Sequence, residues 1–223
     1  MWLGITGAVA AVLVVGLVGV WVYYVNNVEQ PAYTVVRSKG AVEVRDYPRL
    51  LVAEVVRSGE RWEAVRSGFR PLANYIFAKE RGGDAISMTA PVTQSSSETI
   101  AMTAPVTQTP GGGSKAPDNG AREWTVRFIM PSKYTRETLP APGGGDVTIQ
   151  EVPARRMAAI RFSGVATDEL LAAQEAQLRD WIKAEGLTVR GVATFAYYND
   201  PWTPSFLRRN EVMIELAEGP GGG

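Results

Sequence analysis

An internal repeat constrains the fold of this chain more than any other sequence feature, because it implies two similar building units. A shift of 105 residues, from Val42 to Val147, places VEVRDYPRLLVAEVVRSG (residues 42–59) over VTIQEVPARRMAAIRFSG (residues 147–164). Pro48 then coincides with Pro153, and the Ser-Gly pairs that close the two stretches also coincide. The repeat predicts that two copies of one supersecondary unit pack together.

Both copies predict the same order of elements. An alternating strand comes first, then a turn at proline, then a second strand that ends at Ser-Gly, and then a helix. The helices are expected over residues 60–79 and 168–184. Thr167 or Asp168 can cap the second helix, and Gly186 suits its C-terminal end. The first helix has one apolar stripe, made of Trp62, Val65, Phe69, Leu72, Ala73 and Ile76.

Further strands follow each helix. They are expected over residues 86–93, 100–107 and 124–130 in the first half, and over residues 189–198 and 211–216 in the second. Strands in runs with one helix per half are typical of an α+β fold. We therefore expect a pseudo-twofold βαββ repeat that forms a distorted, mainly antiparallel β-barrel or sheet with two helices.

A second, shorter repeat lies inside the first half. ISMTAPVTQSSSETIAMTAPVTQ, residues 86–108, contains nearly the same nine letters twice. The polar SSSE between the copies suits a turn, so we predict a hairpin of two adjacent strands. Architecture, rather than chemistry, explains this duplication.

The N-terminal segment is strongly apolar. Residues 2–25, WLGITGAVAAVLVVGLVGVWVYYV, carry no charge, and the first charged residue is Glu29. Such a segment is long enough to cross a bilayer as one helix. It has no basic start and no Ala-x-Ala site, so a cleaved signal peptide is the weaker interpretation. Its four glycines offer a face for partner transmembrane helices in a larger complex.

The sequence does not decide on which side of the membrane the globular domain lies. Arg37, Lys39 and Arg45 follow the apolar segment, which favours a cytoplasmic domain by the positive-inside rule. An apolar N-terminus ahead of a soluble domain more often acts as an export signal, so we favour the extracytoplasmic (periplasmic) side. The expected division is an anchor (1–25), a connector (26–40), a globular domain (41–217) and a disordered tail (218–223).

Composition excludes several kinds of chemistry. The chain has no cysteine and no histidine, so disulfides, thiolate nucleophiles, the usual zinc sites and Ser-His catalysis are excluded. Lys plus Arg and Asp plus Glu are both 23, so no net charge attracts nucleic acid. No nucleophile-base pair or phosphate-binding glycine loop is visible either. We expect a protein that is not an enzyme and does not bind nucleic acid.

Several phrases taken together resemble the SOUL haem-binding protein family. They are VEVRDYP, the doubled I(S/A)MTAPVTQ, WTVRFIMPSKYTRETLP, RFSG and YYNDPWTPSFLRRNEVMIEL, and they cover nearly the whole globular part in order. The resemblance implies two βαββ halves and binding of haem or another tetrapyrrole in a surface hydrophobic cleft. The same architecture occurs in bacterial effector-binding domains. This chain departs from relatives that use a His ligand, and from soluble members by its apolar N-terminus.

The resemblance also implies where the cleft lies, between the first helix and the loop before the last strand. Carried onto this sequence, the helix supplies Trp62, Arg66, Phe69 and Arg70. The loop over residues 200–209 supplies Trp202 and Phe206. Aromatic rings would pack on the tetrapyrrole face, and the arginines would bind its propionates. Aromatic residues at helical spacing are more often core, and surface arginines are usually only solvated.

Candidate iron ligands are few in a chain without histidine. Met88 and Met102 occupy matching positions in the doubled phrase, and Tyr197 or Tyr198 could bind ferric iron as a phenolate. Methionine in an alternating strand is usually core filler. Binding by stacking and propionate contacts, without iron ligation, fits the sequence better.

The orientation of Glu211 distinguishes two hypotheses. It could close the sheet in a charge cluster with Arg208 and Arg209, or face the cleft as a buried acid that neutralises a cationic ligand. Strand parity places Glu211 on the same face as Met213, so a buried Met213 predicts an inward Glu211.

Three functions remain open at this point. The first is a membrane-tethered binder that stores, transfers or scavenges a tetrapyrrole. The second is an accessory or scaffold subunit of a membrane complex, which an ordered connector would favour. The third is an effector-type binder of amphipathic cations, which an inward Glu211 would favour.

Overall fold

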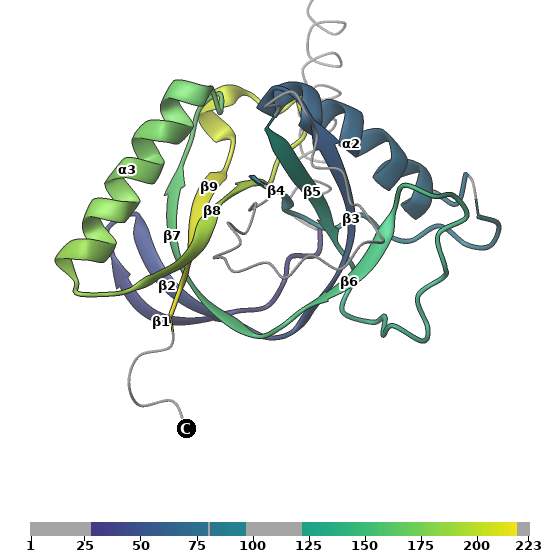
Figure 1. Cartoon of the computed structure of the whole chain (residues 1–223), viewed down its shortest axis with the longest axis horizontal. Coiled ribbons are helices and arrows are strands. Elements are labelled where there is room, and N and C mark those ends of the chain that lie inside the picture. Colours follow the sequence, from purple (N-terminus) through teal and green to yellow (C-terminus); the bar gives the residue numbers. More distant parts are fainter. Residues whose placement is uncertain (1–27, 80, 97–121, 218–223) are drawn as a thin grey trace, which may run out of the picture.

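The structure is a computed structural model, and it describes residues 28–79, 81–96 and 122–217 (Figure 1). These residues form one nine-stranded sheet and two α-helices, which is the α+β class predicted from sequence. The elements are, in chain order, β1 (Thr34–Lys39), β2 (Val42–Tyr47), β3 (Leu50–Ser58), α2 (Arg61–Ile76), β4 (Val92–Ser96), β5 (Glu123–Ile129), β6 (Thr148–Val152), β7 (Arg155–Phe162), α3 (Asp168–Ala184), β8 (Val189–Tyr197), the short 3-10 helix η1 (Ser205–Leu207) and β9 (Asn210–Leu216).

The strand order reflects the internal repeat. The sheet runs β1-β2-β7-β9-β8-β4-β5-β3-β6, and all its strand pairs are antiparallel. Each strand except β1 has a counterpart in the other half: β2 corresponds to β6, β3 to β7, β4 to β8 and β5 to β9. When every strand except β1 is exchanged for its counterpart and the sheet is read from the other end, the same order results. The first strand of each half is exchanged, because β2 pairs with β7 and β6 pairs with β3.

The sheet curves strongly but is open (Figure 1). Its edges are β1 and β6, which are not paired with each other, so of the expected barrel or sheet the described strands form an open sheet. Alternation along each strand separates two faces. In β7, Ala158 and Ile160 pack towards α3, whereas Met157 and Ala159 belong to a separate cluster on the other face.

The two helices pack on different parts of the sheet. Helix α2 contacts β3 and β5, and α3 contacts β7, β8 and β9. Thr167 caps α3 as predicted, because its hydroxyl accepts a hydrogen bond from the Leu170 N–H at 3.2 Å. Gly186 follows α3 with φ +67°, a left-handed conformation that suits glycine at a helix end.

The predicted hairpin of the doubled phrase is wrong for the first copy. Strand β4 begins only at Val92 and lies between β5 and β8, so both its edges are already paired. Ile86, where the strand was expected to start, instead donates its N–H to the Ile76 carbonyl at 2.7 Å, at the end of α2. The second copy, residues 100–107, lies outside the described residues.

The N-terminal anchor (1–25) and the tail (218–223) also lie outside the described residues. Within the described parts of the chain, no helix has the length and apolar character needed to span a membrane. The expected connector, 26–40, contains β1, so the sheet begins before residue 41.

Candidate functional site

Helix α2 carries an exposed row of aromatic and basic side chains, which we call the α2 stripe: Trp62, Arg66, Phe69 and Arg70. The residues that α2 buries against the sheet include Ala64, Gly68 and Leu72, so the stripe lies beside and opposite this buried row. Trp62 is 41% exposed and Phe69 is 40% exposed, which is unusual for large apolar side chains on a helix that packs on a sheet.

Each ring of the α2 stripe is held by one aromatic neighbour. Trp62 stacks on Tyr197 of β8 with ring centroids 5.9 Å apart, and Phe69 packs edge-on to Phe128 of β5 at 5.2 Å. Arg66 and Arg70 are exposed, and neither has an ion pair within the described residues. The stripe therefore combines positioned apolar surface with two cations that are available to an anionic group.

A buried arginine that sequence reasoning missed fixes the start of α2. Arg61 donates hydrogen bonds to the Asp168 carboxylate, to the Tyr197 hydroxyl at 2.7 Å and to the Ala166 carbonyl at 3.0 Å. Burial raises the pKa of Tyr197 to about 12, so its hydroxyl stays neutral. Arg61 thereby joins α2, α3 and β8, and its guanidinium lies 4.6 Å from the Trp62 ring.

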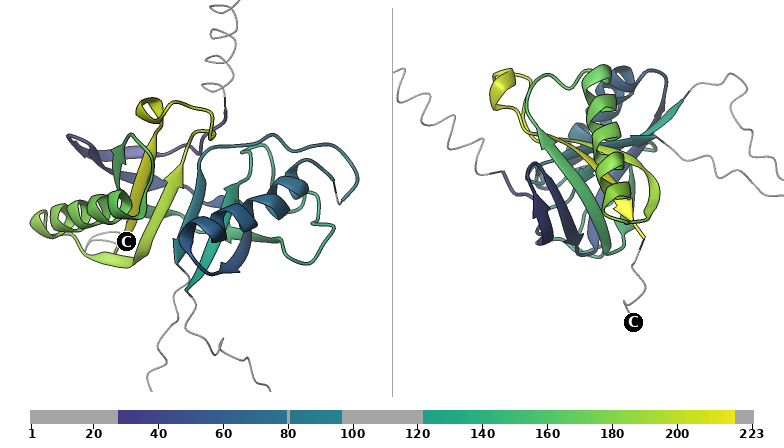
Figure 2. Two further views of the ribbon diagram at one scale, coloured as in Figure 1. Left: turned by 90° about the horizontal axis from the view of Figure 1, so that it is seen from above. Right: turned by 90° about the vertical axis from the view of Figure 1, so that its left-hand side faces the viewer.

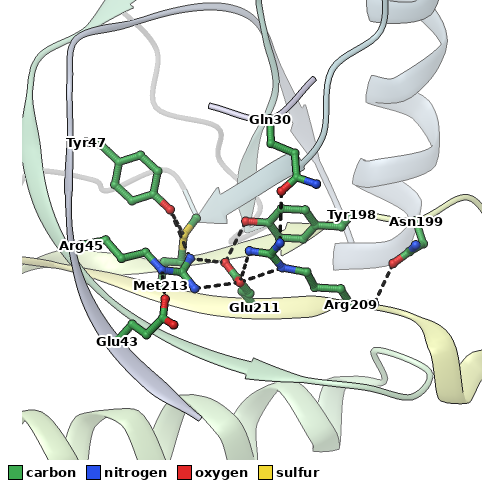
Figure 3. A network of polar contacts seen from close by, with 9 residues as sticks. All are labelled: Gln30, Glu43, Arg45, Tyr47, Tyr198, Asn199, Arg209, Glu211 and Met213. Atoms are coloured by element: carbon green, nitrogen blue, oxygen red, sulfur yellow. Dashed lines mark hydrogen bonds and ion pairs between the residues drawn. The ribbon is translucent and has the colours of Figure 1, made fainter. Parts of the chain in front are cut away.

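A buried polar network occupies the other face of the sheet (Figure 3). Its centre is Glu211, which is 0% exposed. Arg45 donates to both carboxylate oxygens, at 2.7 and 3.0 Å, and Tyr198 donates its hydroxyl at 2.8 Å. Arg209 donates from Nε and Nη2 at 3.0 and 2.7 Å. Met213 is also buried, so the parity prediction of an inward Glu211 is confirmed.

The charges in this network compensate one another. Burial alone would raise the pKa of Glu211, but the hydrogen bonds and charges of Arg45 and Arg209 outweigh it and hold this pKa below its ordinary value. Burial and the Glu211 charge raise the pKa of Tyr198 well above its ordinary value. Glu211 is therefore an ionised acid with two cationic partners. Arg208 is not among them, because it binds the Thr203 and Pro201 carbonyls at 2.7 Å each.

The loop between β8 and β9 presents an exposed apolar tip, which we define as Trp202, Phe206 and Leu207. Trp202 is 87% exposed and Phe206 is 73% exposed. The Asp200 carboxylate accepts the N–H groups of Trp202 and Thr203 at 2.8 Å each, which fixes the turn. Phe206 lines one surface hollow and Arg70 another, and the two hollows share no lining residue.

The candidate iron ligands are poorly placed for ligation. Met88 packs, partly buried, against the core cluster beneath α2, and Met102 lies outside the described residues. The hydroxyls of Tyr197 and Tyr198 are engaged by Arg61 and Glu211, and both pKa values are raised. The described residues also hold no cluster of acidic side chains that could bind a metal ion.

Residues 28–215 match the family model described as SOUL heme-binding protein, which covers almost all of the described chain. The chain belongs to the SOUL family. No curated protein gives a significant sequence match.

Solved structures share the fold of this SOUL chain at low identity. A protein described as a hydrolase from Listeria innocua has a TM-score of 0.51 and 14% identity, covering 82% of this chain and 94% of that one. The C-terminal domain of EcmrR has a TM-score of 0.52 and 12% identity, covering 84% and 99%. An uncharacterized conserved protein from Listeria innocua has a TM-score of 0.53 and 15% identity, covering 80% and 93%. These likenesses establish the fold alone.

Sequence patterns contained a signal for the buried network of this SOUL chain. In β2, Val42 and Val44 point to one face, so Glu43, Arg45 and Tyr47 must share the other. Three polar side chains on the face of β2 opposite the two valines indicate a group of polar contacts on that face of the sheet. The partners Tyr198 and Arg209 could not be assigned to it without the strand order.

Proposed function

We propose that this SOUL protein is a membrane-tethered binder of haem or a related tetrapyrrole, which it stores, transfers or scavenges. The observation that carries the proposal is the α2 stripe, with Trp62 and Phe69 half-exposed beside Arg66 and Arg70. The family match adds haem as the ligand class. The rings would pack on the flat apolar face, and the guanidinium groups would donate to the propionates.

The side chains present fit such a ligand by its face and its propionates rather than by its iron. The chain has no histidine or cysteine, and the tyrosine hydroxyls near α2 and β9 are protonated and hydrogen-bonded. Trp202 and Phe206, the other two residues that the family resemblance assigns to the cleft, are exposed on the loop between β8 and β9. Phe206 and Arg70 line separate hollows, so the proposal rests on the α2 stripe and does not depend on this loop. Bound haem would supply redox and gas-binding chemistry, while the residues of the α2 stripe would orient it and shield it from water.

The tether in this proposal is the uncharged segment 2–25. Its length and composition support a single bilayer-spanning helix, and the extracytoplasmic side remains our favoured location for the domain. A tethered binder would exchange a poorly soluble ligand with the bilayer over a short distance.

The test is a haemin titration of the full chain in nanodiscs, followed by absorbance in the ferric and ferrous states, with empty nanodiscs as the background. We expect saturable binding near one haemin per chain. Trp62→Ala should weaken it about tenfold, because a stacked aromatic contact contributes on the order of 0.5–1.5 kcal/mol beyond its buried area. Arg66→Gln should weaken it by a similar factor.

The matched controls are Phe77→Ala, an equally exposed ring just beyond the end of α2, and Arg49→Gln, an exposed arginine that pairs with Glu151. Both should leave the affinity unchanged. Non-saturating association that none of the four substitutions alters would overturn the tetrapyrrole proposal.

The scaffold alternative has one specific observation in its favour, which is order in the expected connector. Glu29 accepts the Ser132 N–H at 2.7 Å, and β1 pairs with β2. Failure of the haemin titration would make the scaffold function the better supported proposal. The cation-binding alternative is weakened, because the inward Glu211 already has two arginine partners.

A further inference from the structure

The apolar tip lies beside an arginine-rich hollow of about 620 Å³. The hollow is bounded by the β1-β2 hairpin, the end of β7 and residues 206–209, and Phe206 and Leu207 form part of its wall. Its charged lining consists of four arginines and one acid: Arg45, Arg161, Arg208, Arg209 and Glu43. An apolar tip and a cationic hollow at its base therefore occur together on this part of the surface.

Two of these arginines form no ion pair with a carboxylate among the residues that the structure describes. Arg45 pairs with Glu43 and Glu211, and Arg209 pairs with Glu211. Arg161 is exposed, and within the described residues neither it nor Arg208 forms an ion pair. The hollow therefore has a net positive charge available for an anion.

The hollow also lies where the described chain begins. Tyr33 lines it, and Arg209 donates to the Gln30 side chain at 3.1 Å (Figure 3). Both views of Figure 2 place the loop between β8 and β9 at the same end of the molecule as the first described residues. Gln30 lies five positions after Val25, the last residue of the apolar segment, with four residues between them. A fully extended chain of that length spans at most about 18 Å.

We propose that this end of the domain docks on an anionic phospholipid bilayer, with the tip among the acyl chains and a lipid phosphate in the arginine-rich hollow. The inference rests on the membrane tether of the proposed function. Exposed Trp, Phe and Leu side chains are stable at the boundary of the headgroups, and arginines at their base lie at the level of the phosphates. The short connection between Val25 and Gln30 keeps the tip within reach of that boundary.

The absence of cysteine makes a direct test simple, because one introduced cysteine is a unique labelling site. The full chain carrying Phe206→Cys is labelled with an environment-sensitive nitrobenzoxadiazole dye and placed in nanodiscs of phosphatidylglycerol or of phosphatidylcholine. Val56→Cys, on an apolar position of β3 that is 48% exposed, is the control. Phe206 is largely exposed, so the substitution leaves the core intact.

We expect a blue-shifted emission for the label at position 206 in phosphatidylglycerol, a smaller shift in phosphatidylcholine and none at position 56. Adding Arg161→Gln should lower the docked-to-undocked ratio of the tip about fivefold in phosphatidylglycerol, as expected for one basic residue at an anionic surface. Excess inorganic phosphate should not reverse the shift, since the bilayer and not a free anion is the partner.

Three outcomes would overturn the proposal. They are an unshifted emission at position 206 in both lipids, an equal shift in both lipids that Arg161→Gln does not change, and a shift that depends on protein concentration, which would indicate a protein partner. The assay contains no haemin, so its result is independent of the α2 stripe. Absence of the chain from the nanodiscs would instead show that the tether itself fails.

Discussion

At the scale of single residues, Glu211 shows how the fold accommodates a fully buried charge. Its carboxylate accepts from two guanidinium groups and one hydroxyl, so its main lone-pair directions are used. A buried ion pair contributes little net stability compared with apolar packing, but loss of one partner is costly because the remaining charges stay buried. Glu211 is therefore a structural residue that holds β2 to β9 through Arg45.

Replacement of this carboxylate tests that role. Glu211→Gln should lower the free energy of unfolding by roughly 3–5 kcal/mol, because Arg45 and Arg209 lose their charged partner. Urea unfolding of the full chain in detergent, followed by tryptophan fluorescence, measures the change. Asp46→Asn is the matched control, since Asp46 pairs with Arg156 at the surface and should cost less than about 1 kcal/mol.

The same variant predicts a change in pH dependence. The pKa of Glu211 is lowered in the folded state, so its stabilising contribution is complete above the ordinary glutamate pKa of about 4.3 and is lost as pH falls through the lower folded value. Wild-type stability should therefore drop more steeply in acid than that of Glu211→Gln. An equal loss of unfolding free energy in the two proteins as the pH is lowered would contradict an ionised, paired Glu211.

At the scale of elements, the position of α2 depends on one glycine. Gly68 lies where the helix crosses β3 and β5, and an added Cβ would meet Val126 and Val55 atoms at 3.0 to 3.1 Å. The nearest atoms include the Val126 Cβ, which cannot move without its strand. The close approach of α2 to the sheet at Gly68 therefore determines how far the side chains of the α2 stripe lie from the sheet.

We expect Gly68→Ala to destabilise the protein, although alanine is the better helix former. Helix propensity favours alanine by about 1 kcal/mol, whereas overpacking a tight interface costs roughly 1–3 kcal/mol. A net loss of about 1 kcal/mol should be visible in urea unfolding. The neighbouring exposed substitution Ser67→Ala should change stability by less than about 0.5 kcal/mol. A more stable Gly68→Ala would show that α2 can move away from the sheet.

At the scale of the whole molecule, exchange of the first strands makes the two halves interdependent. Strand β3 of the first half lies between β5 and β6, and β7 of the second half lies between β2 and β9. Each half alone would expose three strand edges that are paired in the complete sheet, because β2-β7, β4-β8 and β3-β6 all join one half to the other. The repeat is therefore a repeat of sequence and topology, and the complete sheet is the folding unit.

Separate fragments should show this dependence. Residues 1–142 and 143–223, divided in an exposed loop, should each lack a cooperative thermal transition and should associate when they are co-expressed. Co-purification through a tag on one fragment, followed by calorimetry of the complex, measures both properties. A cooperative transition in either isolated fragment would show that a half folds without its exchanged strand.

Sequence by itself determined the local elements of this protein. Periodicity and the 105-residue repeat predicted both helices, strands β5, β8 and β9, and the α+β class, because hydrophobic spacing reflects which side of an element faces the core. Parity within β9 also predicted that Glu211 points inward with Met213.

Only the tertiary structure decided which strands became neighbours. Repeated letters suggested a hairpin, but β4 pairs with β5 and β8, since strand pairing depends on which edges the rest of the sheet leaves free. Strand order also brings Arg45 and Arg209 together. They are 164 positions apart in the sequence, and both form ion pairs with the Glu211 carboxylate. Local periodicity specifies a face, but a contact between distant residues requires the order of the strands.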